Sequence, residues 1–409
     1  MKGSRKYGLV GRHLSHSYSP AIHAMIEGYE YRLCPLEPGE LADFIRATDL
    51  DGFNVTIPYK KEVIPFCQEL SPRAAAIGSV NTMLRLPDGG WRGDNTDYDG
   101  FLHLLGSDAA AFCGKKALIL GDGGAAATVR AVLGDLNISH ETLRISRHVI
   151  PDIHDRHYDA DLIVNATPVG MYPENGKSPV DPGDFPACRL VLDLIYNPAK
   201  TALMLMAERL GIPARGGLGM LCAQAVRAAE LFLGESLPEG LVDRITEKIR
   251  RDMLNVLLVG MPGCGKTTIG RRLAGLTSRP LLDTDELIQE KAGMSIPDIF
   301  EKHGETYFRE LETAVLREVT KESGKIIATG GGVVTVPENF DLIRQNSICV
   351  FLDREKEKLD ISGRPLSRFV GIDGLYRQRI PLYRAWADFT FRVYDPDTTA
   401  GNIKKELGL

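Results

Sequence analysis

The stretch VLLVGMPGCGKTTIGRRLAG, residues 256–275, decides the fold of the second half of this chain. Within it, Gly260, Gly265, Lys266 and Thr267 fit the pattern G-x-x-x-x-G-K-[ST], after a strand-like run and before a helical pattern. The glycines allow backbone N–H groups to face phosphates, the lysine reaches the terminal phosphate oxygens, and the threonine hydroxyl can bind Mg²⁺. The stretch therefore predicts a loop for a nucleoside triphosphate such as ATP. The residues expected to line it are Gly263, Cys264, Gly265, Lys266, Thr267 and Thr268.

Length and composition set bounds on the rest of the chain. Its 409 residues exceed the roughly 250–300 at which single cores stop growing, so we expect two or more domains. A hydrophobic fraction of 44%, a charged fraction of 25% and a net charge of -5 are typical of a soluble globular protein. No polybasic run indicates nucleic acid or a membrane surface as a partner, so we expect small-molecule substrates.

The cysteines and the apolar runs predict the compartment. Seven scattered cysteines without a Cys-x-x-Cys pair favour a reducing compartment over a disulfide or zinc framework. The first residues lack the apolar core of a signal peptide, and no run reaches the roughly 18 apolar residues of a membrane span. We therefore expect a cytoplasmic protein, whose oligomeric state the sequence does not indicate.

Strand-like runs alternate with helical patterns along most of the chain, which is typical of α/β units around parallel sheets. We expect an α/β domain at residues 1–105, a Rossmann domain at 106–217 and a phosphate-loop domain with a parallel sheet at 253–409. A helical stretch within 218–250 is expected to complete the first domain. A Pro-Gly break followed by a charged helix, in ESLPEGLVDRITEKIRRD at 235–252, marks the expected join.

Acidic and basic residues after the phosphate loop indicate a second ligand. LLDTDELI, residues 281–288, places Asp283 and Asp285 two residues apart at the end of an expected strand, so both should point to one face. Two carboxylates beside a triphosphate repel it unless a cation or a polyol lies between them. Asp283 therefore suits the Mg²⁺ shell and Asp285 a sugar-like hydroxyl. The arginines that suit a carboxylate, because the guanidinium fork binds it with two hydrogen bonds, are Arg309, Arg364 and Arg379.

Taken together, GMPGCGKTTIGRRLA, DTDELI, GETYFRELE, ATGGG, RPL and RQRIPLY resemble shikimate kinase over residues 255–393. The resemblance implies that Lys266 and Asp285 are catalytic and that Thr267 and Asp283 support Mg²⁺. It also implies that Arg364, on a mobile lid, reaches the phosphates. The segment before RPL is shorter than is usual in the family and offers only Arg354. The residues that the resemblance assigns to shikimate are Asp285, Arg309, Gly331 and Arg379.

A glycine turn in KKALILGDGGAAATV, residues 115–129, lies between an expected strand and an expected helix. Gly121, Gly123 and Gly124 suit a dinucleotide pyrophosphate at the helix N-terminus. The following strand, ETLRIS, is succeeded by Arg147. A cation at this place suits the 2′-phosphate of NADP, whereas an NAD enzyme would need an acid for the ribose hydroxyl. The sequence therefore favours NADP(H).

Two residues of the first block suit proton transfer to a carbonyl. In GFNVTIPYKKE, Lys60 is expected at the end of a strand, and in RGDNTDYDGF, Asp97 follows a turn. A lysine and a carboxylate brought together can donate and relay the proton that a hydride transfer requires. Ser17 and Ser19, in SHSYSP, suit a carboxylate or simply an N-cap.

Eight motifs in order closely resemble shikimate dehydrogenase over residues 7–234: LSHSYSPAIH, GFNVTIPYK, AIGSVNTM, GDNTDYDGF, GDGGAAAT, NATPVGM, DLIYNPAKT and GGLGMLCAQA. The resemblance implies that Lys60 and Asp97 form the catalytic pair. The residues that it assigns to 3-dehydroshikimate or shikimate are Ser17, Ser19, Asn54, Thr56, Asn81, Asp97, Tyr196 and Gln224. Those that it assigns to the nicotinamide cofactor are Gly121, Asp122, Gly123, Gly124, Ala125, Arg147, Thr167, Met171 and Gly217.

Both halves would therefore act in sequence on one molecule. The first would reduce 3-dehydroshikimate with NADPH, and the second would phosphorylate the 3-hydroxyl of shikimate with ATP. A quinate-using dehydrogenase with NAD and a non-catalytic sensor of the same metabolites are the alternatives. A sensor can lose Lys60, Asp97 or Lys266 and still bind these metabolites. All three residues are present, which favours an enzyme.

Overall fold

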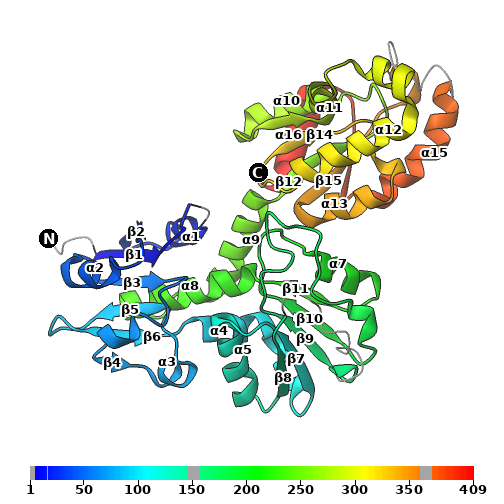
Figure 1. The fold of residues 1–409 in the computed structure, drawn as a ribbon. Helices are drawn as coiled ribbons and strands as arrows, with labels where there is room; N and C mark the ends of the chain where they lie inside the picture. The colour runs from blue at the N-terminus through cyan, green and yellow to red at the C-terminus, as the bar shows by residue number, and fades with distance from the viewer. Residues whose placement is uncertain (1–4, 16, 146–156, 360–370) are drawn as a thin grey trace. The chain divides into compact units, whose positions relative to one another are not determined.

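The computed structural model describes residues 5–15, 17–145, 157–359 and 371–409. The chain forms two compact units, the first of residues 1–169, 178–196 and 206–249, and the second of residues 170–177, 197–205 and 250–409. Strands alternate with helices in both, and the strands of the described residues form three sheets (Figure 1). The α/β fold class expected from the sequence is confirmed.

The first sheet has six strands in the order β2-β1-β3-β5-β6-β4. β1 pairs in parallel with β2 and β3, whereas β5 is antiparallel to β3 and β6. The strands are β1 (Arg5–Gly11), β2 (Tyr29–Pro35), β3 (Gly52–Val55), β4 (Glu69–Leu70), β5 (Thr82–Arg85) and β6 (Trp91–Asp94). The helices of this region are α1 (Ser19–His23), α2 (Leu41–Ala47), η1 (Ile64–Phe66), α3 (Pro72–Ile77), α4 (Asp97–Leu105) and η2 (Gly106–Phe112).

The second sheet has five parallel strands in the order β11-β10-β9-β7-β8. One of its faces packs Ile119 and Val164 against Val129 and Leu133 of α5. The strands are β7 (Lys116–Leu120), β8 (Ser139–Leu143), β9 (Leu162–Asn165), β10 (Leu190–Asp193) and β11 (Ala214–Gly216). The helices are α5 (Gly124–Asp135), η3 (Pro182–Asp184), α7 (Ala202–Arg209) and α8 (Leu218–Leu233).

Helix α8 follows the second sheet in sequence but packs on the first. The Phe232 ring stacks on the Tyr7 ring of β1 with centroids 4.2 Å apart, and the Tyr7 hydroxyl donates a hydrogen bond to the Phe232 carbonyl at 2.6 Å. α8 also lies along α4, which begins with Asp97. Residues of α8 can therefore reach polar groups of the first sheet.

The third sheet has five parallel strands in the order β13-β14-β12-β15-β16. Successive side chains of β12 point to opposite faces, so Leu257 joins the core under α12 and α15, and Leu258 joins the core under α10 and α16. The strands are β12 (Asn255–Val259), β13 (Leu281–Asp283), β14 (Ile326–Ala328), β15 (Ser347–Asp353) and β16 (Phe389–Arg392). The helices are α10 (Lys266–Thr277), α11 (Thr284–Ala292), α12 (Ile296–Val319), η4 (Val333–Thr335), α13 (Glu338–Asn346), η5 (Lys356–Lys358), α15 (Gly371–Trp386) and α16 (Pro396–Leu407).

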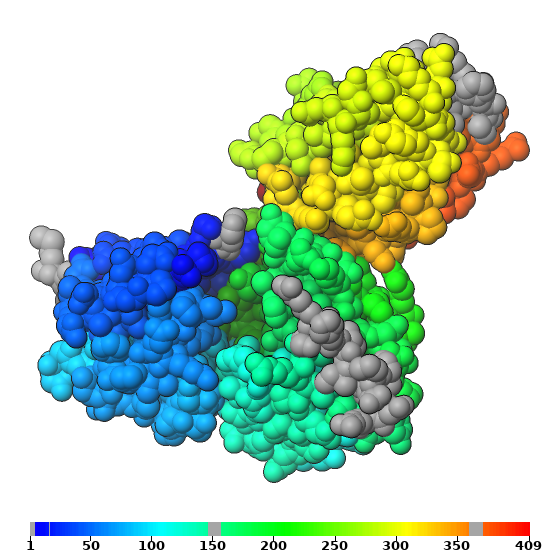
Figure 2. All heavy atoms as spheres, in the orientation of Figure 1, coloured from blue at the N-terminus to red at the C-terminus, as the bar shows by residue number. Residues whose placement is uncertain are grey.

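The expected join contains one continuous helix. α9 (Leu241–Met253) runs from just after the Pro-Gly break to two residues before β12. All seven cysteines are free thiols. None of the helices in the described ranges has the length and apolar character needed to cross a bilayer. Figure 2 shows the heavy atoms of the chain as spheres, from the same side as Figure 1.

Candidate active sites

Lys60 and Asp97 form an ion pair in the first unit. Lys60 Nζ lies 2.6 Å from Asp97 Oδ2, and the two side chains are 25% and 13% exposed. Lys60 was expected at the end of a strand, but β3 ends at Val55, and the lysine lies in the turns that follow. Its carbonyl accepts a hydrogen bond from the Val80 amide at 2.8 Å, which fixes the turn beside the sheet. The pair predicted from sequence is thus brought together by contacts between segments 37 residues apart.

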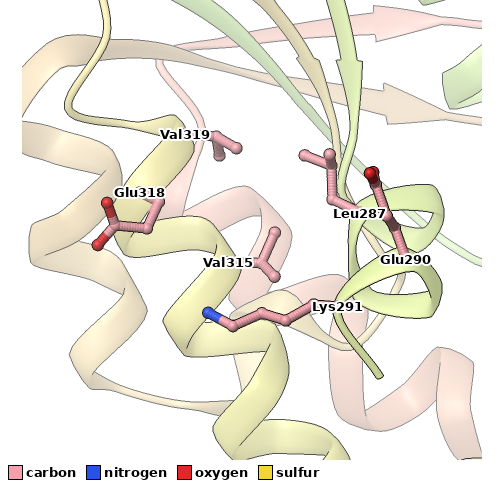
Figure 3. A pocket seen from close by; sticks show the side chains of 6 residues that line it. All are labelled: Leu287, Glu290, Lys291, Val315, Glu318 and Val319. Atoms are coloured by element: carbon pink, nitrogen blue, oxygen red, sulfur yellow. The ribbon is translucent and has the colours of Figure 1, made fainter. Parts of the chain in front are cut away.

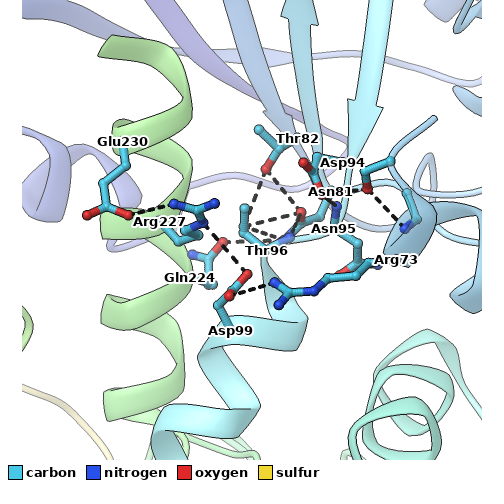
Figure 4. A network of polar contacts seen from close by, with 12 residues as sticks. Arg73, Asn81, Thr82, Asp94, Asn95, Thr96, Asp99, Gln224, Arg227 and Glu230 are labelled. Atoms are coloured by element: carbon cyan, nitrogen blue, oxygen red, sulfur yellow. Dashed lines mark hydrogen bonds and ion pairs between the residues drawn. The ribbon is translucent and has the colours of Figure 1, made fainter. Parts of the chain in front are cut away.

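Asn81 links this pair to α8. Its Nδ2 donates to Asp97 Oδ1 at 2.9 Å and lies 3.5 Å from Gln224 Oε1. Figure 4 shows Asn81 and Gln224 facing each other, with Thr82 and Thr96 beside Asn81. The Asn81 oxygen accepts from the Thr96 amide at 2.8 Å, so the orientation of its side chain is fixed. Lys60, Asp97, Asn81 and Gln224 therefore form one cluster.

Asn54 joins the cluster through Thr82. Its Nδ2 donates to Thr82 Oγ1 at 3.2 Å, and the Thr82 hydroxyl donates to Asn81 Oδ1 at 3.0 Å. Asn54 Oδ1 accepts from the Tyr31 hydroxyl at 2.8 Å. The Tyr31 ring stacks on His23, with centroids 3.8 Å apart, and burial lowers the pKa of His23 from 6.5 to about 3.

Sequence reasoning missed Tyr31 and His23 as supports of this site. Tyr31 lies on β2, where alternation of residue types identifies a strand but not a hydrogen-bond partner. His23 closes the motif LSHSYSPAIH and was therefore visible, yet only its burial shows that the ring is neutral. In the fold, His23 Nδ1 lies 2.6 Å from the Tyr29 hydroxyl.

The remaining predicted substrate residues surround α1 and the end of β3. Ser17 Oγ accepts from the Ser19 amide at 3.2 Å, but the N-cap of α1 is Tyr18, so neither serine is the N-cap. Thr56 directly follows β3, and its amide donates to the Val10 carbonyl at 2.8 Å. The Tyr196 ring meets the Tyr18 ring edge to face, with centroids 6.0 Å apart, and burial raises the pKa of Tyr196.

The glycine turn after β7 has the geometry of a phosphate site. Gly121 has φ +106, and a Cβ there would lie 2.9 Å from the Ala166 carbonyl oxygen, so glycine is required. Gly123 is the N-cap of α5, and the turn Gly121 to Ala125 leads into that helix. Asp122 pairs with Arg130 at 3.2 Å. A Cβ on Gly123 or Gly124 would meet no atom within 4 Å, so the N-terminus of α5 has room for a pyrophosphate.

Other predicted cofactor residues follow β9 and β11. Thr167 donates through its amide and its hydroxyl to Asn165 Oδ1, at 3.0 and 2.7 Å, and Asn165 Nδ2 donates to Asp193 Oδ1 at 3.0 Å. A Cβ on Gly217 would lie 2.1 Å from the Leu194 carbonyl oxygen, so no other residue fits there. Two of the predicted cofactor residues stay predictions. Met171 belongs to segment 170–177 of the second unit, and Arg147 lies outside the described residues.

The phosphate loop of the second unit connects β12 to α10. Lys266 is 7% exposed, and its Nζ donates to the carbonyls of Gly260 and Met261 at 2.8 and 3.1 Å. Gly263 and Gly265 both have positive φ, 78 and 100°, so the loop curls ahead of α10. Cys264 is fully buried, and Thr268 is exposed at the start of α10.

Thr267 and Asp283 meet beside the loop. The Thr267 hydroxyl donates to Asp283 Oδ2 at 2.6 Å. Asp283 ends β13, but Asp285 lies in the first turn of α11, so the argument from strand alternation was wrong. Asp283 Oδ1 instead caps α11 by accepting from the Asp285 amide at 3.0 Å. The cap, rather than the strand, places the two acids side by side.

Arg309 and Glu312 form a buried ion pair on α12. Arg309 Nη1 lies 2.6 Å from Glu312 Oε2, with side-chain exposures of 12% and 1%. A Cβ on Gly330 would lie 2.6 Å from Glu312 Oε1 and 2.9 Å from Asp285 Oδ1, so both carboxylates face this glycine. Burial raises the pKa of Glu312, and the charge of Arg309 opposes this rise. Glu312 was not predicted, although it stands in the quoted motif GETYFRELE.

Arg379 lies close enough to Glu312 to influence its carboxyl group. The arginine is 4% exposed, and burial lowers its pKa. Its Nε and Glu312 Oε1 are buried without a hydrogen-bond partner among the described residues. Gly331 packs against Pro262, and its carbonyl accepts from the Tyr383 hydroxyl. Arg364 lies outside the described residues.

A hollow of about 380 Å³ lies elsewhere on the second unit, between α11 and α12. Figure 3 shows its lining, which is Leu287, Glu290 and Lys291 on α11 and Val315, Glu318 and Val319 on α12. No predicted site residue lines it. Within the described ranges no three His, Cys, Asp or Glu side chains converge as a metal site. A metal ion at Thr267 and Asp283 would therefore need further ligands, such as phosphate oxygens or water.

Two family models match separate parts of the chain. The shikimate dehydrogenase substrate-binding domain matches residues 9–83, and shikimate kinase matches residues 262–398. A shikimate dehydrogenase (NADP(+)) of Synechococcus sp. (strain JA-3-3Ab) is 40% identical over 261 residues, which are 56% of this chain and 88% of that protein. The same enzyme of Oleidesulfovibrio alaskensis is 38% identical over 256 residues, 57% of this chain and 91% of that one.

Solved structures give the same result. A chorismate mutase/shikimate 5-dehydrogenase fusion protein from Clostridium acetobutylicum aligns with a TM-score of 0.55 at 34% identity, over 60% of this chain and 97% of its own. Shikimate dehydrogenase 1 of Peptoclostridium difficile aligns with a TM-score of 0.53 at 30% identity, over 60% and 97%. The chain thus belongs to the shikimate dehydrogenase family and carries a shikimate kinase domain at its carboxyl-terminal end.

Proposed function

We propose that this chain is a bifunctional enzyme that reduces 3-dehydroshikimate to shikimate with NADPH and then phosphorylates the 3-hydroxyl of shikimate with ATP. The observation that carries the first activity is the Lys60–Asp97 pair, joined to the amides of Asn81 and Gln224. The observation that carries the second is a phosphate loop with Asp285, Arg309 and Glu312 beside it. The names of the matched families support both.

In the dehydrogenase, Lys60 would be the proton donor. When bound, NADPH supplies the hydride for the C3 carbonyl, and the ammonium group of Lys60 gives a proton to the carbonyl oxygen as it becomes a hydroxyl. Asp97 holds Lys60 in place through the 2.6 Å contact and accepts from Asn81 on its other oxygen. We assign substrate hydroxyls to Asn54, Asn81 and Gln224 and the substrate carboxylate to Ser17 and Ser19, with Thr56 and Tyr196 at the rim.

The turn after β7 fits a nicotinamide dinucleotide. Gly121 and Gly217 leave no space for side chains, and the N-terminus of α5 is open toward a pyrophosphate. Residues Asp122, Gly123, Gly124, Ala125, Thr167 and Met171 would line the cofactor. We assign the 2′-phosphate of NADP to Arg147.

In the kinase, catalysis would consist mainly of positioning and charge stabilisation. Lys266 would neutralise charge on the transferring phosphoryl group, and Asp285 would orient the attacking hydroxyl. Arg309, Arg379 and Gly331 would hold shikimate, because the buried guanidinium group of Arg379 and the 12% exposed one of Arg309 suit its carboxylate. The hydroxyl of Thr267 and the carboxylate of Asp283 are hard oxygen ligands that fit Mg²⁺.

We accordingly propose a substrate domain of residues 1–105 and 218–250, a cofactor domain of residues 106–217 and a kinase domain of residues 253–409. The substrate domain would be discontinuous because α8 packs on the first sheet through Tyr7 and Phe232. Every residue assigned above would bind a small molecule, which is the substrate, the nicotinamide cofactor or the nucleotide.

Steady-state assays of the purified chain test the proposal. We expect NADPH oxidation with 3-dehydroshikimate, little turnover with NADH, little NADP⁺ reduction with quinate, and ADP formation only when shikimate and Mg²⁺ are both present. Arg147→Asp should raise KM for NADPH steeply and leave turnover with NADH little changed. Turnover with quinate alone, or ADP formation that does not depend on shikimate, would contradict the assignment.

A further inference from the structure

Arg354 stands at the edge of the third sheet that carries the phosphate loop. It directly follows β15, whose parallel neighbour β12 leads into the phosphate loop. The carboxyl ends of parallel strands form one edge of a sheet, and ligands of open α/β sheets bind outside that edge. The backbone therefore delivers Arg354 to the same place as Gly260 to Lys266.

The acids adjacent to Arg354 in sequence already have other cations. Asp353 Oδ2 lies 4.0 Å from Arg384 Nη2. Glu355 is paired with Arg392 at 2.6 Å and with Lys358 at 2.8 Å, and these two cations lower the pKa of Glu355. The side chain of Arg354 makes no ion pair within the described ranges, and its Nε is buried without a hydrogen-bond partner there. A buried guanidinium donor without a partner indicates a missing acceptor.

The guanidinium group lies against the phosphate loop. Arg354 Nη1 is 3.8 Å from the point where a Cβ on Gly265 would stand, and Gly265 is the N-cap of α10. Lys266 meanwhile donates to the carbonyls of Gly260 and Met261, within the loop itself. A nucleoside triphosphate carries up to about four negative charges, so a second protein cation at this point has a clear electrostatic role.

We propose that Arg354 binds the phosphate chain of the nucleotide in the kinase site. This inference rests on the proposed kinase function. The guanidinium N–H donors of Arg354 would face the phosphates from the β15 side, opposite the backbone amides at the start of α10. Arg354 would then supply a cation for the phosphates from the end of β15. Arg364 is expected from the sequence to supply a cation of the same kind. Arg354 would be a nucleotide-binding residue and would not contact shikimate.

The test compares Arg354→Ala and Arg354→Lys with a control arginine. Arg317→Ala is the control, because Arg317 lies on α12, is 45% exposed and is paired with Glu338. KM is measured for ATP and for shikimate, and dissociation constants are measured for ADP, for inorganic tripolyphosphate and for adenosine. The protein is the full chain, and its dehydrogenase activity reports that the first unit is intact.

We expect Arg354→Ala to raise KM for ATP and the dissociation constants of ADP and tripolyphosphate by about tenfold to a hundredfold, as for a lost charge-assisted hydrogen bond. KM for shikimate and the affinity for adenosine should change less than about twofold, and Arg354→Lys should recover part of the loss. Arg317→Ala should behave as the unmodified chain does.

Other results would overturn either the inference about Arg354 or the proposed function. Unchanged affinity for tripolyphosphate in Arg354→Ala would overturn the inference, as would a loss confined to adenosine, which would assign Arg354 to the base. A rise in KM for shikimate equal to that for ATP would show a general disturbance of the domain and also overturn it. Absence of shikimate-dependent ADP formation in the unmodified chain would instead refute the proposed function.

Discussion

Lys60 Nζ and Asp97 Oδ2 lie 2.6 Å apart, and Asp97 accepts from Asn81 on its second oxygen. The carboxylate thus holds the lysine and is itself held, so each group has one defined position. This arrangement suits a proton donor that must meet a carbonyl oxygen at a fixed point.

Asp97→Asn tests the role of the carboxylate. The amide keeps the size of the side chain but removes the charge that holds Lys60. We expect kcat of the reductase to fall by about a hundredfold or more, while kinase activity stays within about twofold. Asp99→Asn is the matched control, since Asp99 lies on the same helix and pairs with Arg73 at 2.7 Å (Figure 4). Equal losses in the two variants would contradict the assignment.

Tyr31→Phe tests the support of Asn54. Without the hydroxyl, Asn54 Oδ1 loses its 2.8 Å hydrogen bond and its orientation is less restricted. We expect KM for 3-dehydroshikimate to rise by about three- to tenfold, with KM for NADPH unchanged. In a double-mutant cycle with Asn54→Ala, the second substitution should add little to the first. Fully additive effects would show that Tyr31 acts elsewhere.

Glu312→Gln tests the orientation of Arg309. Among the described residues, the neutral amide leaves Arg309 with Glu305 as its one ion-pair partner, and Glu305 is 52% exposed. We expect KM for shikimate to rise by about tenfold or more, because a buried ion pair is broken on one side. Glu305→Gln removes the exposed partner of the same arginine and should have little effect. Comparable losses from both substitutions would contradict a special role for Glu312.

His23 gives the first unit a pH-dependent stability. Its pKa is about 3 in the folded protein because burial disfavours the charged ring, and its ordinary value is 6.5. The unfolded chain therefore binds a proton between these values that the folded chain does not. The free energy of unfolding should decrease as pH falls through this window, by about 1.4 kcal/mol per pH unit from this group, and should not depend on it above pH 7.

The measurement is denaturation followed by the fluorescence of Trp91, which lies in β6, in a Trp386→Phe background. Replacing His23 by Gln should remove the steep part of the pH dependence between pH 6 and 4. The same slope in both proteins would show that another group titrates.

The sequence predicted the fold class because three features are local: strand and helix periodicity, the phosphate loop and the glycine turn. It also identified Lys60 and Asp97, which lie within recognisable motifs. It placed Asp285 in a strand, because alternation over three residues cannot distinguish a strand end from a capped helix start. Glu312 and Tyr31 were missed, since their roles depend on burial and on partners that only the packed structure brings within reach.

We propose that one chain carries two separate active sites that act in sequence. The decisive experiment supplies 3-dehydroshikimate, NADPH, ATP and Mg²⁺ to the unmodified chain, Lys60→Ala and Lys266→Ala, and identifies the products by mass spectrometry. The unmodified chain should form shikimate 3-phosphate. Lys266→Ala should stop at shikimate, and Lys60→Ala should form product only from added shikimate. Loss of both steps through either substitution in a folded protein would contradict the account.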